Sequence, residues 1–441
     1  MDRRLFSKGA LLGVTGMLSG AAHANSNSLK LNDTFEVAKS KLINVTNECI
    51  GAGEAPKYQL DGEGKMIQTY KGDLYRHEDG MLGFSHLHPK KVKQFDTFLE
   101  TGCYQVTKES IEMRVPGSIT GRRPGFGNPN GEFPMQHGTN IQYKTNGIRI
   151  GAYNPGLDKE EWTDLRMSLP MISHLGIYRD PSQKRIHEIG TGAAIWLDMS
   201  HDSTTIFDVR IAMSTYGLLS TCFTDTMRVD NLHTADVDFP IYFAGSDDEV
   251  VSGQVSAHWA NSLNDCCFAD GDGPCVVKAT KAFNQFSGWQ FNNVHIVRQG
   301  RKKGVGPESC NLYWTSNGGQ IRGGIIKEPG VMLPLSDGGS YSRKHAQIDA
   351  DGMILGGSSN VIDTWFVGAS GKGRANLRLL SGANSNIIRS YFGGANNEAI
   401  DLIIPEGCKD NIVYCSPGMT ILDKGINTQF IAKEMASIIN E

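Results

Sequence analysis

The stretch Ile206-Phe207-Asp208-Val209-Arg210-Ile211 carries the pattern that decides the fold. An apolar residue and a free position precede a turn residue, and two apolar or small residues separated by one free position follow it. Asp, Asn and Gly tolerate the left-handed backbone of a sharp corner, so the pattern predicts a strand that bends at Asp208. Six further segments align with this one: Val229–Thr234, Val251–Val255, Phe291–Ile296, Ile321–Ile326, Ile362–Val367 and Ile388–Gly393.

A second, shorter strand follows most of these corner strands. Its outer two residues are mostly apolar and its middle residue varies, which is the period of two that a half-buried strand requires. The six examples are Leu218–Ser220, Ile241–Phe243, Leu312–Trp314, Ile348–Ala350, Leu377–Leu379 and Ile400–Leu402.

The corner strands recur at intervals of 22 to 41 residues. One coil cannot bury its inward face alone, but stacked coils about 4.8 Å apart merge their inward columns into one core. A β-sandwich or a propeller would not align two strand types in columns with insertions confined to the turns. The pattern therefore predicts an all-β, right-handed, single-stranded parallel β-helix.

These coils, together with the strand Gly102-Cys103-Tyr104-Gln105-Val106, resemble the pectate-lyase-like right-handed β-helix group over residues 95–416. That group includes secreted polysaccharide lyases and hydrolases and the tailspike depolymerases of bacterial viruses. The resemblance implies a polysaccharide substrate, and the tailspikes further imply a homotrimer and virion tail proteins as partners. The Asp-Gly-x-x-Asp-Asp-Thr motif of the group is absent, and no catalytic signature carries over to particular residues.

The chain ends differ from the repeats. Residues 1–24 begin with Arg3-Arg4 and close on Ala22-His23-Ala24, which predicts a twin-arginine-like signal or, alternatively, an N-terminal docking peptide. Residues 25–95 are read as a cap region with a helix after Asn32-Asp33. The β-helix is predicted over 96–416, and the apolar spacing within 417–441 predicts a short C-terminal capping helix.

Composition excludes several classes of function. The formal charge of −4 offers no positive field for nucleic acid, and no apolar stretch is long enough to span a membrane. The nine cysteines lack the spacing of a disulfide framework or a zinc site, so buried thiols and no metal cofactor are expected.

The middle positions of the second strand type predict an outward column of Leu219, Tyr242, Tyr313, Asp349, Arg378 and Asp401. Tyrosine rings can stack on sugar rings, and Arg378 can bond hydroxyls or uronates. Asp349 and Asp351 would share one face of a strand, with side chains about 6–7 Å apart. Glycosidases use two carboxyl groups at about that separation, so this pair is the first catalytic candidate. A solvated acidic turn is the plainer alternative.

Other candidates lie elsewhere in the chain. Asp247 and Glu249 belong to an acidic cluster that could supply an acid or bind Ca²⁺, although a solvated corner is the simpler explanation. His295 shares a predicted outward column with Arg210 and His233, close to Arg322, where a lyase could find a base and a cation. Trp259 is a further candidate for substrate binding.

The sequence therefore predicts a polysaccharide-degrading β-helix protein, hydrolase or lyase, that acts on a bacterial surface or extracellular glycan. The predicted location is extracellular or periplasmic, or alternatively a virion tail. A non-catalytic carbohydrate-binding adhesin, or a receptor-binding tail component, is the alternative function, and a structural spacer is a third.

Overall fold

A computed structural model of the protein describes residues 43–44, 57–60, 66–69, 95–99, 102–106, 109–113, 117–125, 138–151, 169–180, 182–200, 203–244, 258–278, 288–331, 348–396 and 398–440. All of them belong to one compact unit, residues 43–441. Two long parallel sheets run through this unit. Residues 1–24, the predicted helix after Asn32 and the strand predicted at Val251–Val255 lie outside the described residues, and the domain boundaries stay predictions.

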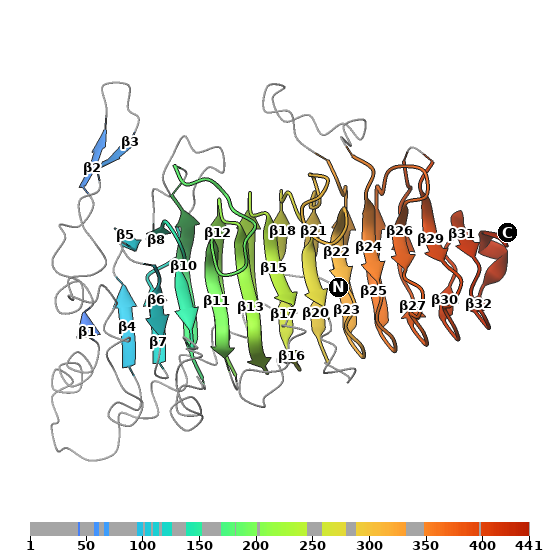
Figure 1. The fold of residues 1–441 in the computed structure, drawn as a ribbon, viewed down its shortest axis with the longest axis horizontal. Helices are drawn as coiled ribbons and strands as arrows, with labels where there is room; N and C mark the ends of the chain where they lie inside the picture. The colour runs from blue at the N-terminus through green and yellow to red at the C-terminus, as the bar shows by residue number, and fades with distance from the viewer. Residues whose placement is uncertain are drawn as a thin grey trace, which may run out of the picture. The chain divides into compact units, whose positions relative to one another are not determined.

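The first long sheet, here called sheet I, is formed by the corner strands. Its members are β1 (Ile43–Asn44), β4 (Phe95–Leu99), β5 (Gly102–Val106), β7 (Gly117–Gly121), β8 (Thr139–Tyr143), β10 (Met171–Arg179), β12 (Thr205–Ala212), β14 (Arg228–Ala235), β17 (Ser262–Asn264), β18 (Cys267–Ala269), β20 (Gln290–Asn292), β21 (His295–Val297), β23 (Gln320–Lys327), β25 (Val361–Val367), β27 (Ile387–Ile388), β28 (Tyr391–Phe392), β30 (Ile412–Tyr414) and β32 (Gln429–Ile431). Figure 1 shows the coils that carry these strands one after another in chain order, from β4 to β32.

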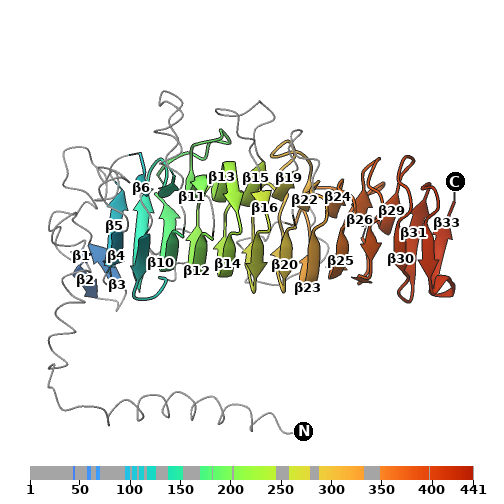
Figure 2. The ribbon, with the colours of Figure 1, turned by 90° about the horizontal axis from the view of Figure 1, so that it is seen from below.

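The second long sheet, sheet II, is formed by the strands that follow the corners. They are β6 (Ile111–Met113), β9 (Ile148–Ile150), β11 (Ala193–Ser200), β13 (Tyr216–Asp225), β15 (Phe239–Ala244), β16 (His258–Trp259), β19 (Cys275–Lys278), β22 (Cys310–Trp314), β24 (Asp351–Leu355), β26 (Ala375–Leu379), β29 (Ile400–Ile404), β31 (Met419–Asp423) and β33 (Ala436–Ile439). Figure 2 separates β10, β12 and β14 of sheet I from β11, β13 and β15 of sheet II. A small antiparallel pair, β2 (Lys57–Leu60) and β3 (Met66–Thr69), lies between β1 and β4 in the chain.

The inward column of sheet I forms the predicted spine. Ile206 is opposite Val229, and Leu263, Phe291 and Ile321 continue the column on the next coils. All five are at most 2% exposed. Together with the parallel pairing of both sheets, this column confirms the parallel β-helix. The coil of β17 and β18 that carries Leu263 was not predicted, because the coil after β14 was expected to begin at Val251–Val255.

The bends in the sheet I strands lie at the predicted turn residues. Asp208, Asn231 and Asn293 have φ values of 52°, 55° and 53°, in the left-handed region. Side chains link neighbouring corners, since Asn231 Nδ2 donates to Asp208 Oδ1 at 2.9 Å and Asn293 Nδ2 donates to Asp265 Oδ1 at 2.7 Å. These contacts explain why Asp and Asn, which combine αL tolerance with short polar side chains, recur at this position.

The predicted C-terminal capping helix is wrong. Residues 429–431 form β32, and a single 3-10 turn at Lys433–Met435, labelled η3, leads into β33. Ala436 and Ile438 pack against the core while Ser437 and Ile439 face solvent, so the segment follows a period of two. Because β33 can continue the ladder of β31, pairing with a preformed sheet outcompetes an isolated helix of this length.

Buried asparagines link the C-terminal coils by hydrogen bonds at the turns that precede β25, β27 and β30. Asn360, Asn386 and Asn411 are 0% exposed. Asn386 Oδ1 accepts the backbone N–H of Asn360 at 3.0 Å, and Asn386 Nδ2 donates to the carbonyl of Gly357 at 3.1 Å. Each amide therefore satisfies backbone groups that could not reach water.

Asn386→Ala is expected to lower the free energy of unfolding by about 2 kcal/mol, because it leaves a buried donor and a buried acceptor without partners. Urea denaturation followed by circular dichroism measures this change. Gln290→Ala, at an exposed position of β20, is the control and should leave stability within about 0.5 kcal/mol of the parent. Equal midpoints for the two variants would contradict the stabilising role of this ladder.

Candidate functional site

The outward column of sheet II keeps four of its six predicted members together, Leu219 among them. Leu219 pairs with Tyr242, and the column continues through Val276 to Tyr313, Ile354 and Arg378. Tyr242, Tyr313 and Arg378 therefore share one outward column, as predicted. The place predicted for Asp349 belongs to Ile354.

The register of β24 explains that error. Met353, not Ile348, lies opposite Leu312, so the strand begins at Asp351 and Asp349 precedes it in a turn. Leu402 likewise lies opposite Leu377, which moves Asp401 away from Arg378 and lets it accept a hydrogen bond from Asn376 Nδ2 at 2.9 Å. Both alternations are apolar at the outer positions, and the longer buried run at 353–355 decides the pairing.

Tyr242 lies in an aromatic cluster on the outer face of sheet II. Tyr216 and Phe239 stack with ring centroids 5.2 Å apart, and Tyr242 packs edge-on against both. Burial raises the pKa of the Tyr242 hydroxyl. Val305, 6% exposed, packs into the same cluster, so the ring of Tyr242 supports a loop as well as facing outward.

That loop, residues 301–309, connects β21 to β22 and forms one wall of a cleft. The Arg301 N–H donates to the Gly271 carbonyl and the Lys302 N–H donates to the Asp272 carbonyl. Arg301 also lies 3.2 Å from the Asp272 carboxylate. Backbone bonds, an ion pair and the buried Val305 thus hold the wall in place.

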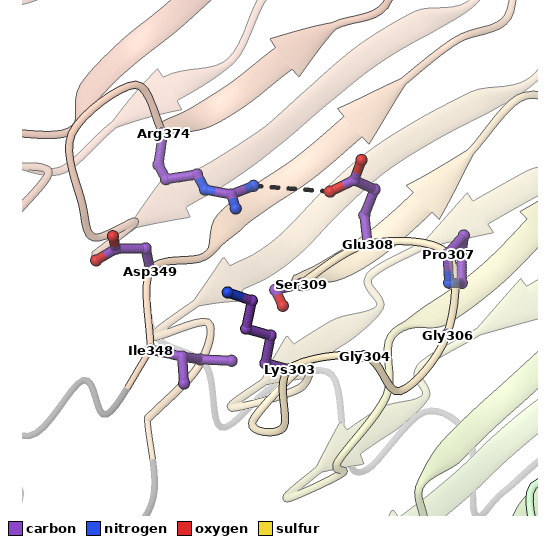
Figure 3. A pocket seen from close by; sticks show the side chains of 9 residues that line it. All are labelled: Lys303, Gly304, Gly306, Pro307, Glu308, Ser309, Ile348, Asp349 and Arg374. Carbon is purple, nitrogen blue, oxygen red and sulfur yellow. Dashed lines mark ion pairs between the residues drawn. The ribbon is translucent and has the colours of Figure 1, made fainter.

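The cleft between this loop and the turns before β24 and β26 has a volume of about 480 Å³. Figure 3 shows Asp349 and Arg374 on one side, Glu308 on the other and the amine of Lys303 between them. The lining residues are Lys303, Gly304, Gly306, Pro307, Glu308, Ser309, Ile348, Asp349 and Arg374. Cations and carboxylates of different coils therefore meet in one opening.

The position of Asp349 depends on Gly371. A Cβ atom at Gly371 would lie 2.3 Å from Cγ of Asp349, and the φ of Gly371 is +110°. Only glycine fits such a conformation and such a close approach. The Asp349 carboxyl group, although exposed, is therefore seated against the backbone of the opposite turn.

Asp351 lies behind the cleft rather than in it. It is 0% exposed, and its Oδ2 accepts hydrogen bonds from Nη1 of Arg374 at 3.0 Å and Nε of Arg378 at 3.1 Å. Its Oδ1 accepts the backbone N–H of Ala375 at 2.8 Å. The predicted geometry, with Asp349 and Asp351 side by side on an outward face, is wrong, because β24 begins at Asp351 and is buried along its length.

Asp351 instead orients two guanidinium groups toward Glu308. Oε2 of Glu308 lies 3.7 Å from Nη1 of Arg374 and 3.6 Å from Nη2 of Arg378. Burial lowers the pKa of Arg374, but the hydrogen bond and charge of Asp351, with Glu308 and Asp349, outweigh it and raise that pKa. Arg374 therefore carries its positive charge at the cleft across the physiological pH range.

Tyr313, on the outer face of sheet II, lies near Glu308 and Arg378. Burial raises the pKa of its hydroxyl, Cys310 and Glu308 raise it further, and Arg378 opposes them. The phenol stays protonated near neutral pH and can donate a hydrogen bond. Of the predicted residues, the structure thus gathers Tyr313, Asp349, Asp351 and Arg378 around one cleft.

The remaining predicted residues are not part of this group. His295 and Arg322 are exposed on sheet I, and Nε2 of His295 lies 3.4 Å from Oδ1 of Asn293. The predicted column of Arg210, His233 and His295 exists, with Cys267 between the two histidines. Trp259 pairs with Asp225 through β16, but its side chain lies outside the described structure, as do Asp247 and Glu249.

Sequence reasoning missed Lys303, Glu308 and Arg374. The first two lie in the stretch Arg301-Lys302-Lys303-Gly304-Val305-Gly306-Pro307-Glu308, an insertion between two strands that is rich in charge, glycine and proline. Such a loop is a recognisable site for function. Nothing local shows that Arg374, on another coil, faces it.

Within the described residues, no group of three or more His, Cys, Asp or Glu side chains is arranged to hold a metal ion. The cysteines described are all free thiols, and most are buried. The described part of the chain also contains no helix that is both long and apolar enough for a membrane span.

No protein-family model matches the chain, and neither does any curated protein sequence. Solved structures do match. The A-module of the mannuronan C-5 epimerase AlgE6 from Azotobacter vinelandii is 10% identical, covering 78% of this chain and 89% of its own, with a TM-score of 0.46. A DFA-IIIase variant from Arthrobacter chlorophenolicus A6 in complex with DFA-III is 10% identical over 81% and 91%, with a TM-score of 0.43. Tailspike protein 3 of bacteriophage CBA120 is 10% identical over 95% and 64%, with a TM-score of 0.36.

Proposed function

We propose that this protein binds and cleaves a polysaccharide in the cleft between the 301–309 loop and the turns that carry Asp349 and Arg374. One observation carries the proposal. Two carboxylates from different coils, Glu308 and Asp349, line an open cleft together with the cations Lys303 and Arg374. The cleft opens on the outer face of a β-helix, where a polymer can cross without an end having to enter.

Hydrolysis of a glycosidic bond is the reaction that this arrangement supports best. One carboxyl group protonates the leaving oxygen, and the other, as a carboxylate, activates water or attacks the sugar. Glu308 and Asp349 lie on opposite walls, so a sugar ring between them could meet one on each side. Arg374, fixed by Asp351, and Lys303 can hold hydroxyls or a carboxylate of the substrate.

Elimination is a second candidate reaction, favoured by the cations. A lyase must stabilise the negative charge that develops on a uronate carboxylate when the neighbouring proton is removed. Lys303 and Arg374 supply two positive charges at one opening. A uronate bound there would be susceptible to elimination if Lys303, Glu308 or Asp349 removed the proton next to the uronate carboxylate.

The setting of the activity is part of the proposal. The twin-arginine-like segment at residues 1–24 supports export to the periplasm or the cell exterior, where the substrate would be a bacterial surface or extracellular glycan. A virion tail, with the chain as a homotrimer, is the alternative setting. A non-catalytic adhesin would bind glycan in the same cleft without turnover.

Purified protein incubated with a panel of capsular, O-antigen and pectic polysaccharides tests the proposal. Hydrolysis is expected to release reducing ends without new ultraviolet absorbance. Elimination would release reducing ends and also create an unsaturated product that absorbs in the ultraviolet. Binding to a polymer with neither signal would establish the adhesin instead. Neither binding nor cleavage of any polymer in the panel would refute the proposal.

A further inference from the structure

Two aromatic rings stand exposed on sheet I, away from the cleft. Trp365 of β25 is directly opposite Tyr391 of β28 in the parallel pairing. Their ring centroids are 5.9 Å apart with planes at 79°, yet the residues are 47% and 58% exposed. Large aromatic side chains in strands usually bury their area, so two adjacent exposed rings are an observation that needs a cause.

The indole of Trp365 packs closely against Gly393. A Cβ atom at Gly393 would lie 2.8 Å from Nε1 of Trp365 and 3.1 Å from Cγ2 of Val367. The ring therefore lies against the glycine of the next coil, with Tyr391 packed edge-on beside it. A ring held in this way loses little conformational freedom when a ligand stacks on it, which favours binding.

Charge around the two rings is mostly positive. The outward residues of β23, β25 and the segment 387–393 include Arg322, Lys327 and Arg389, against the carboxylate of Asp363. Glu328 follows β23 directly and is paired with Arg298 at 3.7 Å. Arg389 and Asp363 lie 3.6 Å apart, both about half exposed. On a chain with a formal charge of −4, this strip is a local excess of cations suited to a carboxylated ligand.

We propose that Trp365 and Tyr391 form a second contact site for a carboxylated polysaccharide, separate from the cleft. The apolar faces of sugar rings stack on the two aromatic rings, and Arg322 and Arg389 bind the carboxylates. A stable protein interface buries roughly 800 Å² per side, whereas two adjacent rings flanked by cations match the size and charge of a few residues of an acidic sugar polymer. This inference rests on the proposed function for the identity of the polymer, but not for its location.

The test is affinity electrophoresis of the full chain in gels that contain polygalacturonate, alginate or hyaluronate, with neutral dextran as the comparison polymer. Trp365→Ala and Tyr391→Ala are each expected to weaken binding to a retained anionic polymer by roughly tenfold. Trp365→Phe should retain most of the affinity because it keeps a stacking face. Phe207→Ala removes another exposed aromatic residue, 41% exposed, from β12 on the same sheet and should leave the affinity unchanged.

The outcomes separate this site from the cleft. Weaker polymer binding by Trp365→Ala, with parental cleavage of short oligosaccharides, supports the second site. The same loss of binding in a protein that cleaves nothing supports the site and refutes the proposed cleavage. Parental affinity in Trp365→Ala, an equal loss in Phe207→Ala, or no retention of the parent by any anionic polymer would overturn the second site.

Discussion

Glu308→Gln is expected to lower the rate constant for polysaccharide cleavage by roughly two orders of magnitude or more. The amide keeps the size of the side chain but can neither give nor take the proton that bond cleavage requires. Asp349→Asn should cause a loss of similar size, because acid and base act on the same bond from opposite walls. Initial rates of product release, measured with a polymer that the parent cleaves, provide the comparison.

The matched control is Glu406→Gln, which changes an exposed glutamate in the turn between β29 and β30. Its rate should equal that of the parent. Glu308 is 41% exposed, so Glu308→Gln should unfold at nearly the parental temperature, and a loss of activity would then concern chemistry rather than folding. Parental rates for both cleft variants would assign catalysis to another part of the molecule.

The β-helix could be predicted because its two signals have separate physical causes that agree. Burial requires the period of two in the strands, and the left-handed corner requires Asp, Asn or Gly. At Asp208, Asn231 and Asn293 both signals were correct. The corner of β25 is Thr364, whose backbone is not left-handed. At the equivalent bend of β23 there are two residues instead of one, Gly323 and Gly324, and both are left-handed. There the apolar alternation alone carried the prediction.

The C-terminal segment failed because its apolar residues fit two periods. Phe430, Ile431, Met435, Ile438 and Ile439 follow a helical spacing, but Ala436 and Ile438 also follow the strand spacing. In isolation, the helix propensity of this segment would decide its structure. Here the open edge of β31 offers hydrogen bonds to a strand, which favours β33. The sequence window contains no information on that edge.

The candidate site was predictable only in part. Tyr313 and Arg378 could be placed in one column because each is the middle residue of a three-residue apolar alternation. Asp349 was assigned to the column by a register error that local sequence cannot prevent, since Ile348-Asp349-Ala350 and Met353-Ile354-Leu355 are both apolar at their outer positions. Glu308 lies in a loop insertion 66 residues before Arg374 in the chain. The two side chains meet only because the coils that carry them stack on one another.

Asp351→Asn is expected to destabilise the protein by about 3 kcal/mol, at the lower end of the range for a buried ion pair that loses one partner. The carboxylate is fully buried and joins two guanidinium groups, each about a quarter exposed or less, so the amide would leave both cations without their buried counter-charge. Urea denaturation measures the loss.

The comparison that isolates burial is Asp363→Asn. Asp363 also faces an arginine, Arg389, at 3.6 Å, but both side chains are nearly half exposed. Water already screens that pair, so its loss should change stability by less than about 0.5 kcal/mol. Asp351→Asn should in addition weaken polymer binding in the cleft, because Arg374 loses the hydrogen bond that orients it, whereas Asp363→Asn should leave cleavage of short oligosaccharides unchanged. If the two variants had equal unfolding midpoints, Asp351 would not be the anchor of the cleft, and the arginines would have to be oriented by Glu308 alone.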